Sequence, residues 1–463
     1  MNCRTYHKSV LSLFLAAAPC LCHADTMPDD VALQTLLRER VDQSHQTPAI
    51  VVGWVDETGT RIIHWGRLDR AGNREVDGDT VFEIGSATKV FTALLLAQEV
   101  EQGKVSLDDP VSKYLPPSVK VPARNGRQIT LLDLATHTSA LPRLPGNLAP
   151  KDAANPYADY TVEQLYAFLS GYTLPRDIGA EYEYSNLGVG LLGHILALEA
   201  GTNYEALVLQ RICRPLGMTN TQITLSPDLK ARLATGHNAA GDPVANWDFP
   251  TLAGAGALRS TANDLLKFVA ANLGLVKSDL RPAMQLSQKS RHSAGSPDMD
   301  IGLCWHIAKK FGTDLVWHNG GTGGYRSFIG FDPQKRRGVI VLANSANSVD
   351  DLGFHLLEPK YPLARFQPPK SHTAIRLEAT ALDRYAGRYE FAPGLYFNLR
   401  RDGVRLLAQL TGQPYNEIFP ESETEFFYKI VDAQITFVKD SQGHVTALIL
   451  HQNGQNPRAE KIP

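Results

Sequence analysis

A serine and a lysine three residues apart stand directly before a long apolar run. Ser86-Ala87-Thr88-Lys89 precedes the run from Val90 to Ala97, which predicts a buried helix. Three positions in a helix make nearly one turn, so the Ser86 and Lys89 side chains share a face. A serine hydroxyl needs a nearby base to act as a nucleophile. A lysine amine in an apolar site can lose its charge and serve as that base.

Two further motifs favour this catalytic interpretation over a plain helix cap followed by a surface lysine. Tyr184-Ser185-Asn186 leads into an apolar helix expected over Leu187 to Ala200. A glycine-rich segment that starts at His318 lies between two strand-like runs. A Ser/Lys pair, a polar motif ending in Asn and a glycine-rich triad, in this order, are typical of the serine enzymes that react with penicillin.

With Tyr184 in place of the first serine of the S-D-N motif, the chain resembles the class C β-lactamase family. That family also contains D-alanyl-D-alanine carboxypeptidases and endopeptidases, D-aminopeptidases and esterases. The resemblance extends over about Val31 to Asn347, and two more stretches fit the family pattern: Ile129 to Leu141 and Gly254 to Leu265. It implies an α/β (α+β) β-lactamase/transpeptidase-like domain, in which an antiparallel sheet carries a helical insertion.

The resemblance also implies a role for each motif residue. Ser86 attacks a carbonyl carbon, and Lys89 and Tyr184 share the transfer of its proton. Which of the two is the base stays open, because their titrations are expected to be coupled. The family pattern places the oxyanion hole at the backbone N–H groups of Ser86 and Gly321. The predicted catalytic residues are Ser86, Lys89 and Tyr184, and the predicted substrate-binding residues are Asn186, His318, Asn319, Gly320 and Gly321.

His318 departs from the family's β-lactamases, which carry lysine at this position. A lysine is a fixed positive charge facing the substrate carboxylate, whereas a histidine is mostly neutral at pH 7 and can still donate a hydrogen bond. This difference moves the expectation towards peptidases and esterases. His137 is interpreted as a hydrogen-bonded structural residue, since Lys89 and Tyr184 already fill the role of the base.

We therefore expect a serine hydrolase of the class C β-lactamase / D-Ala-D-Ala carboxypeptidase type, forming an acyl-enzyme on β-lactams or D-alanyl peptides. The alternatives are an esterase on short-chain esters and a penicillin-binding sensor that acylates without turnover. The chain has no G-x-S-x-G elbow, which argues against an α/β-hydrolase. It has no clustered metal ligands and no phosphate loop, so no metal or other cofactor is expected. With a net charge of −2 and no basic block, nucleic acid is not an expected partner.

The first 24 residues resemble a secretory signal peptide, with two basic residues before the apolar stretch from Val10 to Ala18. That stretch is too short to span a membrane as a helix. We expect a periplasmic protein that has no stable membrane anchor and acts on a small-molecule or peptide substrate. Cys213 and Cys304 are the only cysteines after this segment, and whether they pair stays open.

Apolar periodicity predicts a sheet built from both ends of the first domain, with helices between them. A helix is expected over Asp30 to Val41, followed by a hairpin, and two irregular segments cover residues 141–160 and 236–256. Thr130 is expected to cap one helix, and Ser260 or Thr261 another. The hairpin strands are Ala49–Val55 and Arg61–Trp65, and the later strands are Gly302–His306, Asp314–His318, Ser327–Asp332 and Gly338–Ala343.

A proline-rich stretch near residue 368 reads as a linker. After it, short alternating runs separated by turn residues predict a small all-β barrel, which resembles the lipocalin-like domain appended to some serine hydrolases. The predicted boundaries are a signal peptide over 1–24, the hydrolase domain over 25–366, a linker over 367–378 and the barrel over 379–463.

Overall fold

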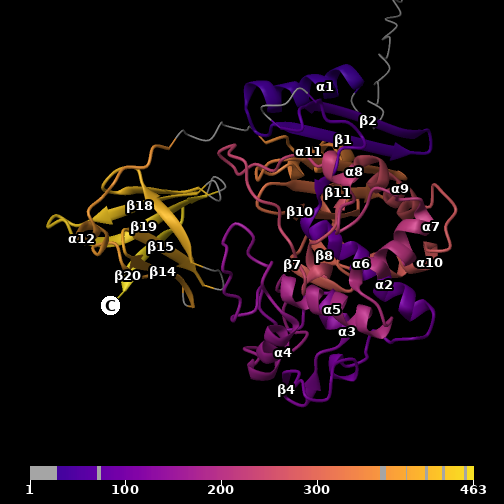
Figure 1. Cartoon of the computed structure of the whole chain (residues 1–463), viewed down its shortest axis with the longest axis horizontal. Coiled ribbons are helices and arrows are strands. Elements are labelled where there is room, and N and C mark those ends of the chain that lie inside the picture. Colours follow the sequence, from indigo (N-terminus) through magenta and orange to yellow (C-terminus); the bar gives the residue numbers. More distant parts are fainter. Residues whose placement is uncertain are drawn as a thin grey trace, which may run out of the picture.

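The computed structural model describes residues 29–69, 74–364, 372–392, 394–411, 415–429, 433–452 and 456–462. The predicted signal peptide therefore lies outside the described residues. The described chain forms an α/β domain and, after residue 378, an all-β barrel (Figure 1).

The α/β domain is built on an eight-stranded antiparallel sheet in the order β2-β1-β12-β11-β10-β9-β8-β7. The N-terminal hairpin joins strands from the far end of the domain, because β1 pairs with both β2 and β12. This pairing confirms a sheet assembled from both ends. The strands are β1 (Ala49–Asp56), β2 (Gly59–Gly66), β7 (His292–Ser296), β8 (Met299–Ile301), β9 (His306–Ala308), β10 (Leu315–Gly321), β11 (Arg326–Asp332) and β12 (Arg337–Ala343).

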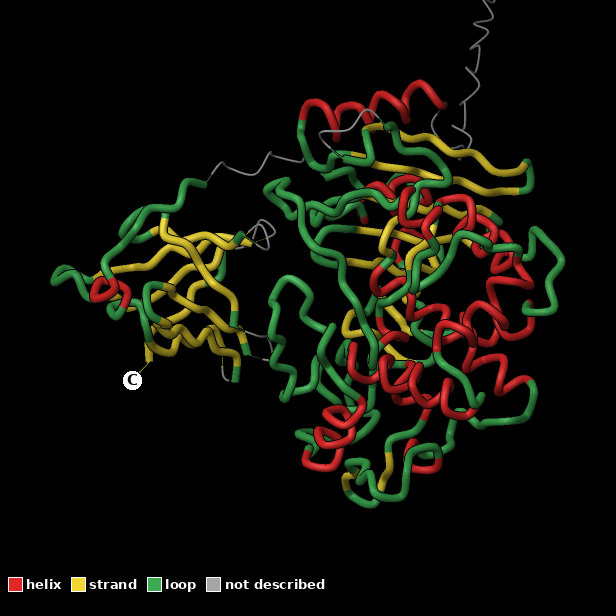
Figure 2. The backbone as a smooth tube through the Cα atoms, in the orientation of Figure 1, coloured by secondary structure: helices red, strands yellow, loops and turns green. Residues whose placement is uncertain are grey.

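Helices cover both faces of this sheet (Figure 2). Successive side chains of a strand point to opposite faces, so Val51 and Val55 of β1 pack with α2 and α9, whereas Ile50 and Val52 pack with α1 and α11. The two hydrophobic cores hold the sheet between them and fix its register. These helices are α1 (Asp30–Arg38), α2 (Thr88–Glu101), α9 (Ala262–Leu273) and α11 (Asp350–Leu357).

The helical insertion between β2 and β7 carries the remaining helices and four short strands. The two segments predicted to be irregular, 141–160 and 236–256, contain no helix longer than the 3-10 turn at Ala253–Ala255. The elements are α3 (Leu131–Ala135), α4 (Val162–Gly171), α5 (Asn186–Glu199), α6 (Tyr204–Val208), α7 (Arg214–Leu216), α8 (Pro227–Ala231) and α10 (Arg281–Gln288), with β3 (Phe82–Glu83), β4 (Ala123–Arg124), β5 (Arg127–Gln128) and β6 (Arg259–Ser260).

Two helix caps lie at residues predicted from the sequence. Thr130 caps α3 in a capping box with Asp133, in which each side chain accepts a hydrogen bond from the other residue's backbone N–H. Of the two candidates for α9, the cap is Thr261, whose hydroxyl accepts a hydrogen bond from the backbone N–H of Asp264. Ser260 instead shares a hydrogen bond with the hydroxyl of Thr221.

The strand expected over Gly302 to His306 is wrong, because only its last residue begins a strand. The preceding residues form a tight connection in which Cys304 has a positive φ of 56° and Trp305 donates its N–H to the carbonyl of Leu303. These side chains are all buried, and a short buried apolar run has the same sequence pattern as a strand. Cys304 and Cys213 are both buried free thiols, so they form no disulfide with each other.

The C-terminal unit is a closed antiparallel barrel of eight strands, shown in yellow in Figure 1. Pairing of β13 with β20 closes it, and a separate core fills it, in which Tyr389, Phe426 and Phe437 are buried. The predicted all-β barrel is therefore confirmed. Its elements are α12 (Ala379–Leu382), β13 (Gly387–Ala392), β14 (Leu395–Asp402), β15 (Arg405–Leu410), β16 (Asn416–Pro420), β17 (Glu425–Tyr428), β18 (Ala433–Lys439), β19 (Val445–Gln452) and β20 (Arg458–Ile462).

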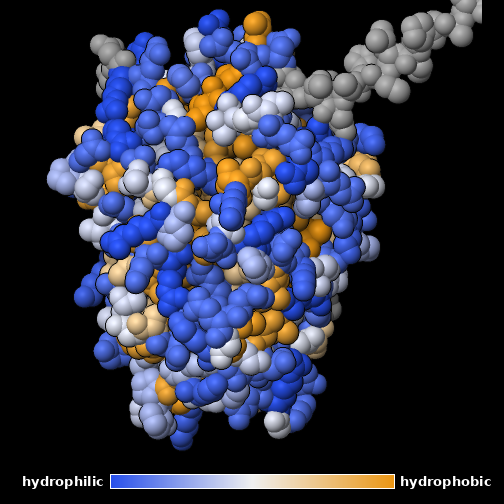
Figure 3. Space-filling view, turned by 90° about the vertical axis from the view of Figure 1, so that its right-hand side faces the viewer, coloured by the Kyte–Doolittle hydropathy of each residue, from blue (hydrophilic) through white to orange (hydrophobic). Residues whose placement is uncertain are grey.

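The surface of the face seen in Figure 3 is mainly hydrophilic, with small hydrophobic patches scattered over it. Among the helices of the described segments, none is long and apolar enough to cross a bilayer.

The Thr261 cap gives a test of the fold. Replacing the capping hydroxyl in Thr261→Ala should lower the free energy of unfolding of the α/β domain by about 1 kcal/mol, because the Asp264 N–H then loses its partner. Thr261→Ser keeps the hydroxyl and should retain most of that stability. Urea denaturation of the three proteins measures the difference, and equal losses in both variants would contradict the assigned cap.

Candidate active site

Ser86 lies in a 3-10 turn, Gly85–Ala87, between strand β3 and helix α2. Gly85 adopts a positive φ of 49°, and a Cβ at this position would stand only 2.7 Å from the backbone nitrogen of Gly321. Glycine is therefore required at position 85 both by its conformation and by its surroundings. The turn leaves Ser86 partly exposed, whereas Lys89, one turn further along, is fully buried.

The amine of Lys89 lies within hydrogen-bond distance of three uncharged groups. Its Nζ lies 3.0 Å from Oγ of Ser86, 2.7 Å from Oδ1 of Asn186 and 2.7 Å from the carbonyl oxygen of Ala255. No described carboxylate forms an ion pair with it. Burial lowers the pKa of Lys89 well below its usual value. The geometry thus brings Ser86, Lys89 and Asn186 together, and burial shifts Lys89 towards its neutral form.

Tyr184 lies beside Ser86 and Lys89. Lys89 Nζ is 4.8 Å from the centre of its ring, and a polar contact joins its side chain to that of Ser86. Burial raises the pKa of Tyr184, and the nearby Ser86 and Arg143 offset this only in part. The phenol therefore keeps its proton near neutral pH.

His137 packs against the Tyr184 ring at 4.6 Å between ring centres. Its Nδ1 accepts a hydrogen bond from the backbone N–H of Ser185 at 3.1 Å. Burial lowers the pKa of His137 well below its usual value, so the ring is neutral. The His137 side chain thus packs against the Tyr184 motif and binds its backbone, which agrees with the structural interpretation of this histidine.

The glycine-rich motif lies at the end of β10, directly against the Ser86 turn. A Cβ on Gly320 would overlap the carbonyl oxygen of Ile84, and Oγ of Ser327 on β11 donates a hydrogen bond to the same oxygen at 2.8 Å. This contact ties the sheet to the segment that carries Ser86. It brings the backbone of Gly321 next to that of Gly85, where two N–H groups can point at one substrate oxygen.

The side chains of His318 and Asn319, the other two residues of this motif, form hydrogen bonds within the protein. His318 is fully buried, and its Nδ1 lies 2.5 Å from the carbonyl oxygen of Asn319, which can only accept, so Nδ1 carries the proton. Burial lowers the pKa of His318 well below its usual value. Nδ2 of Asn319 donates to Asp350 at 2.5 Å. That His318 contacts a substrate carboxylate stays a prediction. The lowered pKa favours the neutral ring, so such a contact would be a hydrogen bond and not an ion pair.

Several residues at the site were not among those predicted from the sequence. The carbonyl of Ala255 holds Lys89, and an aromatic group lines the approach to Asn186, where Tyr157 stacks on Phe249 at 4.4 Å and Trp247 lies 5.6 Å from Tyr157. All four belong to the two segments predicted to be irregular.

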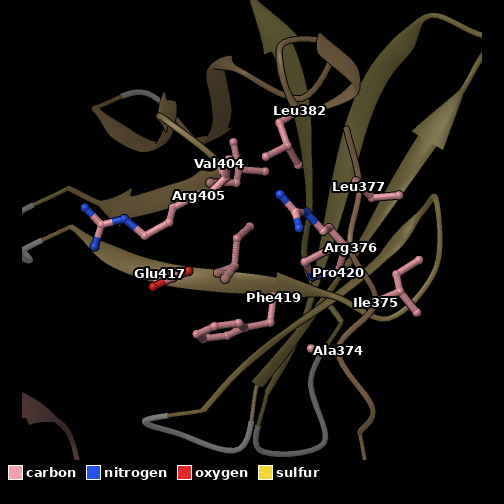
Figure 4. A pocket seen from close by; sticks show the side chains of 12 residues that line it. Ala374, Ile375, Arg376, Leu377, Leu382, Val404, Arg405, Glu417, Phe419 and Pro420 are labelled. Carbon is pink, nitrogen blue, oxygen red and sulfur yellow. The ribbon is translucent and has the colours of Figure 1, made fainter. Parts of the chain in front are cut away.

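Among the described residues, no group of three or more His, Cys, Asp or Glu side chains is arranged to hold a metal ion. A hollow of about 300 Å³ in the barrel is lined by apolar side chains such as Leu382 and Val404, together with Arg376 and Glu417 (Figure 4). None of its lining residues is Ser, Thr, Cys, His or Lys, so it has no counterpart of the Ser86–Lys89 pair.

Comparison with known proteins assigns the two units. The β-lactamase family model matches residues 33–356, and the model of a domain of unknown function, DUF3471, matches residues 371–461. The chain belongs to the β-lactamase family. It is a serine hydrolase of the type that includes class C β-lactamases and D-alanine carboxypeptidases, as the sequence motifs predicted.

Its relatives include a carboxypeptidase, a penicillin-binding protein and class C β-lactamases. The D-alanyl-D-alanine-carboxypeptidase/endopeptidase AmpH of Escherichia coli strain K12 is 35% identical over 314 residues, which are 62% of this chain and 79% of AmpH. Penicillin-binding protein 4* of Bacillus subtilis is 26% identical over 92% of this chain and 97% of its own length. A class C β-lactamase from Rhodobacter sphaeroides superposes with a TM-score of 0.61 and 25% identity, over 71% of this chain and 98% of its own.

The contact between Gly320 and Ile84 gives a test of the site. Gly320→Ala should push the Ser86 turn away from β10 and lower kcat/KM by about 10² or more, the usual effect of losing an oxyanion donor. Gly171→Ala is the matched control, because a Cβ there meets nothing within 4 Å. Hydrolysis of a nitrophenyl ester measures both variants, and near-normal activity of a folded Gly320→Ala protein would contradict this arrangement.

Proposed function

We propose that this protein is an exported serine hydrolase that cleaves amide bonds of D-alanyl peptides and β-lactams through an acyl-enzyme on Ser86. The observation that carries the proposal is the buried Lys89 amine, 3.0 Å from the Ser86 hydroxyl and surrounded by uncharged acceptors. A neutral amine at this distance can accept the serine proton.

The opposite pKa shifts of Lys89 and Tyr184 suggest how the two share the proton transfers. Burial lowers the pKa of Lys89 and raises that of Tyr184, so the amine is free to accept and the phenol is able to donate. Lys89 takes the Ser86 proton while Oγ bonds to the carbonyl carbon. The backbone N–H groups of Ser86 and Gly321 stabilise the oxyanion.

When the carbon–nitrogen bond breaks, the Tyr184 hydroxyl gives its proton to the leaving nitrogen and regains one from Lys89. The acyl group then remains on Ser86. Water attacks it by the same route in reverse, with its proton passing to the Lys89–Tyr184 pair and on to Oγ of Ser86 as the acid product leaves. Both half-reactions balance without a metal or an oxidant.

The substrate class is supported by the relatives, since AmpH is named for carboxypeptidase and endopeptidase activity on D-alanyl-D-alanine and others are named β-lactamases. The Asn186 side chain shares Lys89 Nζ with Ser86, and its Nδ2 lies 3.5 Å from the Tyr157 hydroxyl. Short-chain esters are the second candidate, which the uncharged His318 at the third motif favours.

The first residues of the sequence support a periplasmic location. The basic start and short apolar stretch indicate export, and D-alanyl peptides of the cell wall would be available in the periplasm. We assign the barrel a structural or substrate-restricting role, since its described pocket has no counterpart of the Ser86–Lys89 pair.

The roles of the three motif residues can be separated by covalent labelling. Ser86→Ala should abolish labelling by a fluorescent penicillin, because it removes the atom that forms the ester. Lys89→Ala and Tyr184→Phe should each slow acylation by about 10² or more, the usual loss for a positioned proton-transfer group. Intact-mass spectrometry follows the adduct. Labelling of another serine in Ser86→Ala would contradict the assignment.

Turnover distinguishes the proposed hydrolase from its alternatives. We expect a peptide ending in D-Ala-D-Ala and a cephalosporin to be hydrolysed, and the penicillin adduct to decay. Hydrolysis of nitrophenyl esters alone would identify an esterase. An adduct that persists for hours with no product would identify a penicillin-binding sensor.

A further inference from the structure

The catalytic centre is almost without positive charge. Lys89 is buried and favours its neutral form, and burial also lowers the pKa of His137, of His318 and, to about 4, of His306. These imidazoles surround Tyr184, with ring centres at 4.6, 6.2 and 6.4 Å from that of the tyrosine. Near neutral pH none of these groups offers a permanent charge to an anionic substrate.

The other cations near the motifs are already engaged. Arg326, beside Gly321, donates to the backbone carbonyls of Thr322 and Tyr325 at 3.1 Å. Arg259 forms a buried ion pair with Glu83 at 3.1 Å. Neither side chain is available to a molecule that enters over Ser86.

Arg143 is the exception among the described residues at the site. Its side chain is exposed, and its guanidinium carbon lies 5.0 Å from the centre of the Tyr184 ring. No described carboxylate forms an ion pair with it. Its charge reaches the catalytic groups, because it acts on both Lys89 and Tyr184. It is therefore an always-charged, solvent-accessible group next to the residue that faces the scissile bond.

The backbone of Arg143 is held in place. Its carbonyl oxygen accepts hydrogen bonds from the N–H groups of Asn186 at 3.0 Å and Leu187 at 3.2 Å. The Ser185 hydroxyl donates to the carbonyl of the preceding residue, Pro142, at 2.7 Å. The segment is thus fixed to the start of α5, so that Arg143 keeps its position relative to Tyr184 and Asn186.

The chemistry of the leaving group places an anion close to this cation. In a D-alanyl peptide the leaving nitrogen is separated from the terminal carboxylate by a single carbon. In a penicillin or cephalosporin the carboxylate is attached to the ring at the same distance from the lactam nitrogen. The nitrogen that Tyr184 protonates therefore carries a carboxylate on the tyrosine side of the site.

We propose that Arg143 binds the carboxylate next to the scissile bond and so selects substrates that carry one. This inference rests on the proposed function, because it assumes that Ser86 is acylated by such substrates. Arg143 supplies the charge that His318 lacks, from a different segment of the chain. A guanidinium can hold both carboxylate oxygens at once, which a neutral imidazole cannot do.

A penicillin and its carboxyl methyl ester test this proposal, because the ester keeps the ring system and removes the negative charge. Acylation of Ser86 is followed by intact-mass spectrometry over a range of concentrations. The unmodified protein should prefer the free acid. In Arg143→Gln the acid-to-ester ratio of acylation efficiency should fall about ten-fold, the loss expected for one charge-assisted contact. The change should lie in the half-saturating concentration rather than in the limiting rate.

Two variants complete the design. Arg143→Lys keeps the charge and should recover part of the ratio. Lys151→Gln removes an exposed charge from the same irregular segment and should leave the ratio unchanged. A fall of equal size for acid and ester in Arg143→Gln would mean a structural role and overturn the proposal. An unchanged ratio would overturn it while leaving the proposed function intact. Failure of both compounds to acylate the unmodified protein would overturn the proposed function together with it.

Discussion

A buried lysine amine with only uncharged partners is the feature on which the rest of this site depends. Lys89 is buried, and its three hydrogen-bond partners are the Ser86 hydroxyl, the Asn186 amide oxygen and the Ala255 carbonyl. A carboxylate among them would hold the amine in its charged form. The absence of one from this group of partners lets burial decide the charge state, and burial favours the free base.

The fold brings these partners from three separate parts of the chain. Helix α2 carries Lys89, the start of α5 carries Asn186, and the segment before β6 supplies the Ala255 carbonyl. The sheet then positions the last component, because the contact of Gly320 with the backbone of Ile84 allows β10 to lie against the Ser86 turn. Chemistry at Ser86 thus requires both the helical insertion and the sheet in their final arrangement.

Much of this architecture could be predicted because it depends on local patterns. The hairpin, the helices after Ser86 and Tyr184, the cap at Thr130 and the barrel all follow from periodicity or capping residues. The buried run around Cys304 imitated a strand, because apolar composition does not reveal a positive φ. Tertiary features such as the Ala255 carbonyl, the aromatic lining at Tyr157 and the position of Arg143 have no local signature, since they depend on how irregular segments fold back over the site.

The most direct test of this account is a measurement of the charge on Lys89. Lysine labelled with ¹³C at Cε can be followed by NMR as the pH is raised, and Lys89→Met identifies the signal. The account predicts that one lysine titrates well below its usual value and that this signal disappears in the variant. A Lys89 signal that titrates near 10.5, with the surface lysines, would mean that the amine is charged at neutral pH and would contradict its role as the base.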